Sequence, residues 1–262
     1  MPDPRHNFEP QTTGELLDSA SRLYFRNFPL LFGMSAIFHL PSIAIEIVRV
    51  ARYVTATRVT LQGAMLELLA ILITLFVITP LTGGTTAQTV SDIYLGNTVT
   101  LGAALRTAWS RYGTLLKSNF IPMIAVIAGF VMLVVPGIVW LLSYLFITQI
   151  VMNEGMSRSR SIRVRSKDLV RGYRGKAFVI IVVILLIELL ARAGIRSMAR
   201  FFIGAAAVSG MAPILNESVA IIVAPMSALS MTLLYYDLRI RKEGFDLEML
   251  TRAVGMGNPH EV

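Results

Sequence analysis

Four acidic side chains interrupt stretches of the chain that are otherwise apolar, namely Glu46, Glu67, Glu188 and Glu217. A charge in the hydrocarbon of a bilayer costs about 2.5 kcal/mol or more, so such a residue is a candidate for proton transfer, ion coordination or substrate binding. Glu46 lies three residues before Arg49, and Glu188 lies four before Arg192, spacings that favour local ion pairs on a helix. Glu67 has no basic residue within a helical turn and is therefore the strongest single candidate among the four.

The remaining chemistry-bearing residue types are sparse. His39 falls in the first apolar stretch and is a second candidate for an intramembrane function, although hydrogen bonding inside a helix bundle explains a single histidine more simply. His6 and His260 have no second histidine at ligand spacing, and the chain has no cysteine. No glycine-rich phosphate loop or nucleophile elbow is present. The sequence therefore predicts a protein that is not an enzyme and that holds no cofactor or metal.

Basic residues are concentrated between residues 158 and 176, where Asp168 is the single acid. The eight residues are Arg158, Arg160, Arg163, Arg165, Lys167, Arg171, Arg174 and Lys176. Each basic residue near an anionic leaflet contributes about 1 kcal/mol, so this segment is predicted to contact acidic lipid headgroups. The alternative is a loop that only sets topology. The net charge of +8 lies beside apolar segments rather than on a soluble face, and nucleic acid is not an expected partner.

Membrane-spanning helices must position these side chains. The chain is 55% hydrophobic and 15% charged, against about 25% charged in soluble domains. A hydrocarbon core of about 30 Å is crossed by about 20 helical residues. Six spans are predicted, at residues 28–48, 61–81, 116–135, 138–153, 177–191 and 214–236. We expect one all-α membrane domain over residues 1–262, with a first span that is not a cleaved signal and a tail at 237–262.

Residues 120–152 form a run of 33 without a charge or a histidine, which is too long for one span and slightly short for two. A helical hairpin resolves this, with its turn predicted at Pro136 and Gly137. With six spans, eighteen of the 24 Lys and Arg fall on one side and six on the other. A single span over the run would give fifteen and nine. The positive-inside rule thus predicts six spans in the cytoplasmic membrane, with both termini cytoplasmic.

Amphipathic stretches precede the spans. Thr12 and Glu15 form a capping-box pattern at the start of a predicted amphipathic helix over residues 12–27. Apolar residues recur at helical spacing again over residues 101–116, and more weakly over residues 157–176. The sequence therefore predicts three units, each an amphipathic helix followed by a transmembrane hairpin. Repeated hairpins occur in transporters and in scaffolds alike.

Residues 234–248 read LYYDLRIRKEGFDLE. This segment resembles the C-terminal signature of a broad group of poorly characterised bacterial and archaeal multi-span proteins. That group is related to the membrane domain attached to some glycerophosphoryl diester phosphodiesterases. Residues 135–138, 153–155 and 165–172 are similar to the same group. The resemblance implies a six-span membrane protein and supplies no catalytic residues. The phosphodiesterase barrel is a separate soluble domain, so that activity is not expected here.

The sequence thus favours a non-enzymatic membrane scaffold or accessory subunit, whose partner would be membrane lipids and either another membrane protein or a second copy of the chain. The alternative is a transporter or lipid-handling permease, for which Glu67, His39, Gln149 and Pro225 are the candidates. An enzyme comes third. A sealed apolar interior would favour the scaffold, whereas a polar cavity reaching Glu67 would favour transport.

Overall fold

The computed structural model describes residues 10–55, 61–97 and 100–244, and every regular element in these ranges is a helix. Six helical stretches are long and apolar enough to cross a membrane: Phe28–Ala51, Leu61–Tyr94, Tyr112–Met132, Val134–Asn153, Arg174–Ile203 and Gly210–Glu243. The all-α class and the multi-pass membrane assignment are confirmed. Residues 245–262 of the predicted tail, together with His6 and His260, lie outside the described residues, and residues 237–243 continue the last helix.

The first helix, α1 (Thr13–Arg26), begins with the predicted capping box. The Thr12 N–H donates to Glu15 Oε2 over 2.7 Å, and the Glu15 N–H donates to Thr12 Oγ1 over 3.3 Å. The bond from the Thr12 N–H lowers the pKa of the Glu15 carboxyl, because it favours the charged form. One face of α1 is buried through Leu16, Ala20, Leu23 and Tyr24, so this amphipathic helix is confirmed.

The second apolar stretch is one continuous helix with a widened turn. It follows α2 (Phe28–Thr55) and consists of α3 (Leu61–Ile73), the π-helical turn η1 (Thr74–Ile78) and α4 (Thr79–Tyr94). Pro80 has no N–H to donate to the carbonyl of Phe76, four residues earlier. The Tyr112 hydroxyl donates to that carbonyl instead, over 2.6 Å, and Thr79 Oγ1 donates to the Thr74 carbonyl over 2.9 Å. The proline is therefore accommodated by a π-turn with side-chain donors.

The uncharged run forms a hairpin made of α6 (Tyr112–Met132) and α7 (Val134–Ser143), preceded by α5 (Leu101–Ser110) and followed by α8 (Ile147–Asn153). Its turn is at Leu133, which is extended with φ −161° and ψ 149°. The turn predicted at Pro136 and Gly137 is thus displaced, because proline is tolerated in the first turn of α7. A Cβ added to Gly129 would lie 2.8 Å from Gly137 Cα, so the two legs touch through their backbones.

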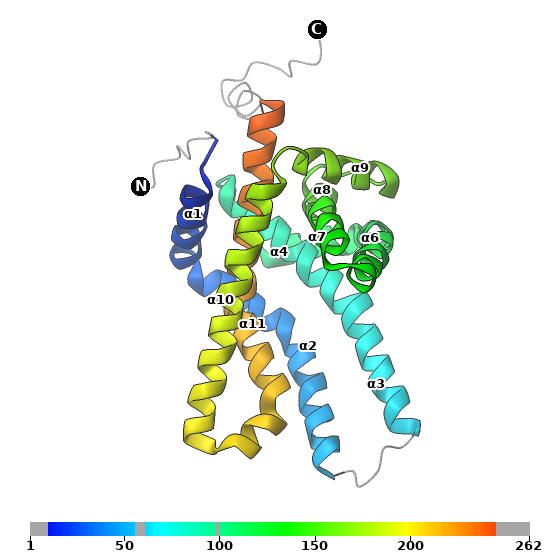
Figure 1. Ribbon diagram of the computed structural model, residues 1–262, viewed down its shortest axis with the longest axis vertical. Helices are drawn as coiled ribbons and strands as arrows, with labels where there is room; N and C mark the ends of the chain where they lie inside the picture. The colour runs from blue at the N-terminus through cyan, green and yellow to red at the C-terminus, as the bar shows by residue number, and fades with distance from the viewer. Residues whose placement is uncertain (1–9, 56–60, 98–99, 245–262) are drawn as a thin grey trace.

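The chain ends with α9 (Ser159–Val170), α10 (Arg174–Ile203) and α11 (Ala205–Glu243). Gly204, with φ 84°, joins α10 to α11, a conformation that favours glycine. Figure 1 shows two ends of the molecule. The α9 end holds α1, α9 and the last turns of α11, and the Gly204 end holds the turn at Gly204 with the neighbouring ends of α2 and α3.

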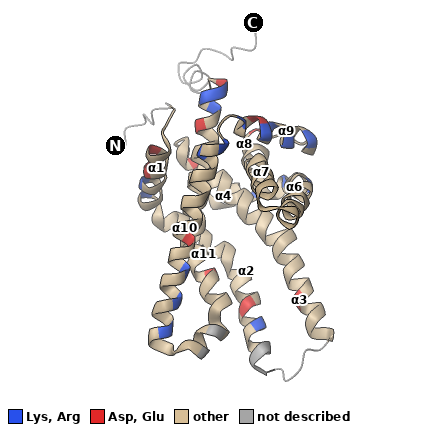
Figure 2. Ribbon diagram, in the orientation of Figure 1, with Lys and Arg blue, Asp and Glu red and all other residues tan. Residues whose placement is uncertain are grey.

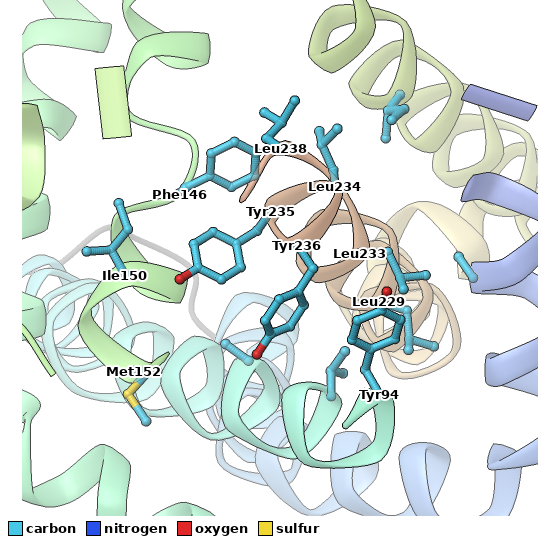
Figure 3. Packing of buried hydrophobic residues seen from close by; sticks show 14 of the residues in the cluster. Tyr94, Phe146, Ile150, Met152, Leu229, Leu233, Leu234, Tyr235, Tyr236 and Leu238 are labelled. Carbon is cyan, nitrogen blue, oxygen red and sulfur yellow. The ribbon is translucent and has the colours of Figure 1, made fainter. Parts of the chain in front are cut away.

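The buried core lies toward the α9 end. Tyr235 and Tyr236 on α11 are fully buried, and Figure 3 shows Tyr235 directed toward Ile150 of α8 and Tyr236 toward α4. The rings of Tyr236 and Tyr94 stack with centroids 5.0 Å apart. In contrast, no residue of α3 is buried. The packing is therefore dense where α1, α4, α8, α9 and α11 meet and sparse along α3.

Candidate functional site

The predicted basic segment divides into exposed and paired residues. Figure 2 shows α9 crossing the α9 end of the molecule with basic residues along it. Its buried side is Ile162, Ser166, Leu169 and Val170. The exposed members of the predicted set are Arg158, Arg160, Lys167, Arg171 and Arg174, whereas Arg163, Arg165 and Lys176 are partly buried. Five of the eight are thus presented outward from this end, an arrangement typical of an interfacial amphipathic helix.

Arg165 is held in a network that joins α8, α9 and α11. Its Nε donates to Glu154 Oε2 over 3.0 Å and its Nη2 donates to Glu243 Oε2 over 2.7 Å. Tyr235 donates its hydroxyl to Glu154 Oε1 over 2.9 Å. Burial alone would lower the pKa of the Arg165 guanidinium, but the bonds to Glu243 and Glu154 outweigh burial and raise that pKa. Arg165 is therefore a structural cation, paired with carboxylates of α11 and of the residue that follows α8.

A second network, here called the Asp237 clamp, joins the segment before α1 to α10 and α11. Asp237 is buried and accepts from the Gln11 N–H over 2.7 Å, from Lys176 Nζ over 2.6 Å and from Arg241 Nε over 3.1 Å. Lys176 Nζ and Arg241 Nη2 also donate to the Gln11 carbonyl, over 2.5 and 2.6 Å. Lys176 therefore serves the fold, although it was predicted as a headgroup contact.

Glu67 is paired across helices. Arg49 Nη2 of α2 donates to Glu67 Oε1 of α3 over 2.5 Å, and Arg49 Nη1 donates to Glu46 Oε1 over 2.7 Å. The sequence prediction that Glu67 lacks a basic neighbour holds only within its own helix. The partner comes from α2, eighteen residues earlier. The Glu46–Arg49 pair is confirmed, and so is the Glu188–Arg192 pair.

His39 is bonded to its own helix, with Nδ1 2.8 Å from the Ser35 carbonyl. Glu217 of α11 lies close enough to His39, Glu46 and Arg192 to interact electrostatically with each. Arg196 Nη2 donates to Asn216 Oδ1 over 2.8 Å. The structure thus brings charged groups from α2, α10 and α11 together, and it places Glu67 with Arg49 rather than with His39.

Helix lengths place these charges relative to the Asp237 clamp. Arg196 follows Lys176 by twenty residues and Glu217 precedes Asp237 by twenty. At 1.5 Å per residue each separation is about 30 Å, the thickness of the hydrocarbon core. Arg196 and Glu217 thus lie about one hydrocarbon thickness from the clamp along their helices. Glu188, about 18 Å from Lys176 along α10, lies between these levels and is paired with Arg192.

Gln149 and Pro225, the other transport candidates, lie apart from Glu67. Gln149 is buried in α8, and its Oε1 has no hydrogen-bond partner. In the helical turn before Pro225, the Ile222 carbonyl accepts the Tyr24 hydroxyl over 2.9 Å. A cavity of about 210 Å³ lies between α2, α4 and α5, lined by Pro29, Leu30, Gly33, Met34, Ile37, Thr89 and Leu101. Its walls are mostly apolar, with Thr89 as the polar side chain, and neither Glu67 nor His39 contributes to them.

Sequence reasoning missed several polar residues that the fold uses. Arg111 donates to the carbonyls of Val151 and Met152 at the end of α8, over 2.6 Å each. Thr85, Thr89 and Thr232 are buried with hydroxyls that have no hydrogen-bond partner. The spacing of Thr82, Thr85 and Thr89 places these three on one face of α4. This spacing is the feature of the sequence that could have indicated a polar face on that helix.

Among the described residues, no group of three His, Asp or Glu side chains could hold a metal ion. Comparison with protein-family models, with curated proteins and with solved structures gives no match.

Proposed function

We propose that the protein is a non-enzymatic membrane scaffold or accessory subunit whose contact surface is α3. The observation that carries this proposal is that α3 buries none of its residues in the bundle. Its ties to the rest of the chain include the Arg49–Glu67 bond at one end and the bond from Tyr112 to the Phe76 carbonyl in η1. A helix of this kind offers most of its surface to a partner, because apolar helices in lipid associate by packing and polar contacts.

The Asp237 clamp and the Arg165 network support the same proposal. The carboxylates of both networks accept hydrogen bonds from donors of the chain itself. They therefore stabilise the fold and are not needed to bind a ligand. The 210 Å³ cavity has mostly apolar walls and is separate from Glu67, which also favours a scaffold over transport.

The proposal is tested by placing a photo-crosslinking residue in the membrane-embedded protein. Leu66 and Leu69 are the positions on α3, and Leu186 and Leu190 on α10 are matched controls, since all four are exposed leucines. We expect a discrete protein adduct from the α3 positions and lipid adducts alone from the α10 positions. Lipid adducts alone from all four positions would remove α3 as a contact surface.

Transport is the second candidate, favoured by the convergence of His39, Glu217 and Arg192 from three helices. A proton or cation path there would give proteoliposomes a permeability that Glu217→Gln reduces while the protein stays folded. Glu67→Gln serves as the comparison, because Arg49 keeps Glu46 as a partner in that variant. Equal permeability of liposomes with and without the protein rules transport of these ions out.

The α9 end is proposed to face the cytoplasm in the cytoplasmic membrane, with both termini on that side. The eighteen-to-six distribution of basic residues supports this orientation. Because the chain has no cysteine, Ser159→Cys should react with an impermeant thiol reagent only in opened cells, and Met198→Cys also in intact cells. The reverse labelling would invert the orientation.

The three-unit arrangement and the relation to the phosphodiesterase-associated membrane domain are also part of the proposal. The positions of α1, α5 and α9 before the hairpins support the arrangement, and residues 234–244 support the relation.

Anionic headgroups are proposed to contact the exposed basic residues of the α9 segment. Replacing Arg158, Arg160 and Arg171 by Gln should reduce the anionic lipid that co-purifies with the protein. The difference in lipid content between the variant and the wild type should be smaller at high salt, because exposed charges are already screened within about 8 Å at physiological ionic strength. Arg22→Gln on α1 is the matched control. Unchanged lipid content would leave this segment a topological role only.

A further inference from the structure

We infer that the α6–α7 hairpin is re-entrant: it enters the membrane from the α9 end, turns at Leu133 inside the hydrocarbon and returns to the same end. Its apolar tip is then a contact surface for the acyl chains of the leaflet that α9 faces. The chain would cross the membrane four times, through α2, α3–α4, α10 and α11. This inference is independent of the proposed contact surface on α3, because it concerns depth and not a protein partner. It changes the three-unit arrangement in one respect, since the second of the three hairpins then does not cross the membrane.

Two bonds fix the legs of the hairpin at the level of α9. Ser118 Oγ of α6 lies 3.2 Å from Ser159 Oγ at the start of α9, and the Phe146 N–H donates to Ser166 Oγ over 3.2 Å. α9 is itself tied to the outermost turns of α11, because Lys242 donates to the carbonyl of Arg171 over 2.6 Å. The bases of both legs therefore lie at the edge of the membrane or beyond it.

From these anchors the legs are too short to cross. Met132 follows Ser118 by fourteen residues, which is about 21 Å of helix even if α6 were parallel to the membrane normal. The other leg is α7, with ten residues or about 15 Å, against a hydrocarbon core of about 30 Å. Figure 1 shows α6 and α7 steeply inclined to α10, and neither descends to the Gly204 end. The turn at Leu133 thus lies inside the hydrocarbon and does not reach its far side.

The chemistry of the tip agrees with that depth. Residues 131–135 are five successive apolar side chains, each 63% to 81% exposed. In contrast, the helix ends at the Gly204 end carry charges: Arg49 and Glu67 near the ends of α2 and α3, and Arg196 and Arg200 near the end of α10. A tip at a membrane surface would expose its apolar residues to water and headgroups, whereas acyl chains solvate them. The positive-inside count is unchanged, because the tip has no charge.

The tip interrupts the helical backbone at a single residue. Irregular backbone at membrane depth needs hydrogen-bond partners from the protein, because lipid offers none. Here the break is one residue, and the Leu133 N–H donates to the Gly129 carbonyl over 2.9 Å while the Gly137 N–H donates to the Leu133 carbonyl over 3.4 Å. The close contact between Gly129 and Gly137 holds the legs together.

The test is the depth and accessibility of a single cysteine at the tip, in full-length protein reconstituted in vesicles. Leu133→Cys is compared with Arg160→Cys on α9 and Met198→Cys toward the Gly204 end, all at exposed positions. We expect impermeant maleimide to label Arg160→Cys from one side, Met198→Cys from the other, and Leu133→Cys from neither. A fluorophore attached at Leu133→Cys in detergent should be quenched most strongly by lipids whose nitroxide lies near the acyl terminus.

Two results would overturn the inference. Labelling of Leu133→Cys from the Met198 side means that the hairpin crosses the membrane. Labelling from the Arg160 side, or strongest quenching by a headgroup nitroxide, means that the hairpin lies on the surface.

Discussion

At the scale of single residues, a tyrosine hydroxyl replaces a backbone donor that proline removes. Tyr112 donates to the Phe76 carbonyl that Pro80 leaves open. In lipid no water can take over this role, so a released carbonyl needs a donor from the protein. Pro80 is thus tolerated because a side chain from α6 reaches the carbonyl that it releases.

Tyr112→Phe removes one hydroxyl and leaves the ring in place. We expect it to lower the free energy of unfolding by about 1–3 kcal/mol, the cost of an unsatisfied buried acceptor. Tyr144→Phe is the control, because the contact of Lys167 with the Tyr144 ring, 5.0 Å from its centroid, does not need the hydroxyl. Thermal unfolding in detergent measures both variants, and equal losses would contradict the assigned role of Tyr112.

Asp237→Ala tests the clamp at the same scale. The side chain is 2% exposed, and its removal leaves the cations of Lys176 and Arg241 with the Gln11 carbonyl but without a carboxylate. Breaking a buried pair costs about 3–5 kcal/mol, so we expect a large loss of stability. Asp18→Ala removes a carboxylate whose pair with Arg22 is solvent-exposed, and it should change stability by less than about 1 kcal/mol. Similar unfolding temperatures for the two variants would show that Asp237 is not a structural anchor.

At the scale of elements, the hairpin depends on two glycines. A Cβ on Gly129 would lie 2.8 Å from Gly137 Cα and 2.9 Å from Gly137 N, so Gly129→Ala must separate the legs. We expect a loss of about 1–3 kcal/mol, as for overpacking elsewhere. Gly194→Ala on α10 meets nothing within 4 Å and should be neutral or stabilising, by up to about 1 kcal/mol. Unfolding curves that rank Gly129→Ala at or above wild type would contradict the close crossing.

The helices were predictable from sequence where a local pattern of residues determines them. The capping box at Thr12 and Glu15 and the apolar runs located α1 and the long helices, because both signals are local. The turn of the hairpin was predicted three residues late, because proline fits the first turn of a helix as well as a loop. The length of the hairpin legs could not be read, since composition shows which residues tolerate lipid and not how deep they lie.

The candidate site was predicted only in part, for a related reason. Glu46 and Glu188 have their basic partners within a turn, and those pairs were expected. Glu67 and Arg49, or Lys176 and Asp237, are joined only when helices distant in sequence pack together. Residue spacing carries no information about such pairs, so Arg165 and Lys176 were assigned to lipid when the fold uses them itself.

At the scale of the whole molecule, the two membrane halves differ in content. The half toward the α9 end contains α1, α4 to α9 and parts of every long helix, whereas the half toward the Gly204 end contains α2, α3, α10 and α11 (Figure 1). If the hairpin is re-entrant, its legs add volume to the α9-side half alone. Such a cross-section is a wedge that widens toward α9, and a wedge fits a membrane that is convex on that side.

The wedge predicts a preference whose sign depends on orientation. In membrane tubes pulled from giant vesicles, protein with its α9 end on the outer, convex face should be enriched in the tube relative to the flat membrane. The same protein inserted in the opposite orientation should be depleted, because its wide half then lies in the compressed inner leaflet. Fluorescence of a dye on Arg160→Cys measures the density in tube and vesicle, and an impermeant quencher reports which orientation is present. Enrichment in both orientations would mean that the protein prefers curved membrane for a reason other than a wedge shape. Equal density in tube and vesicle would mean that the unequal content of the two halves has no effect on the curvature that the protein prefers.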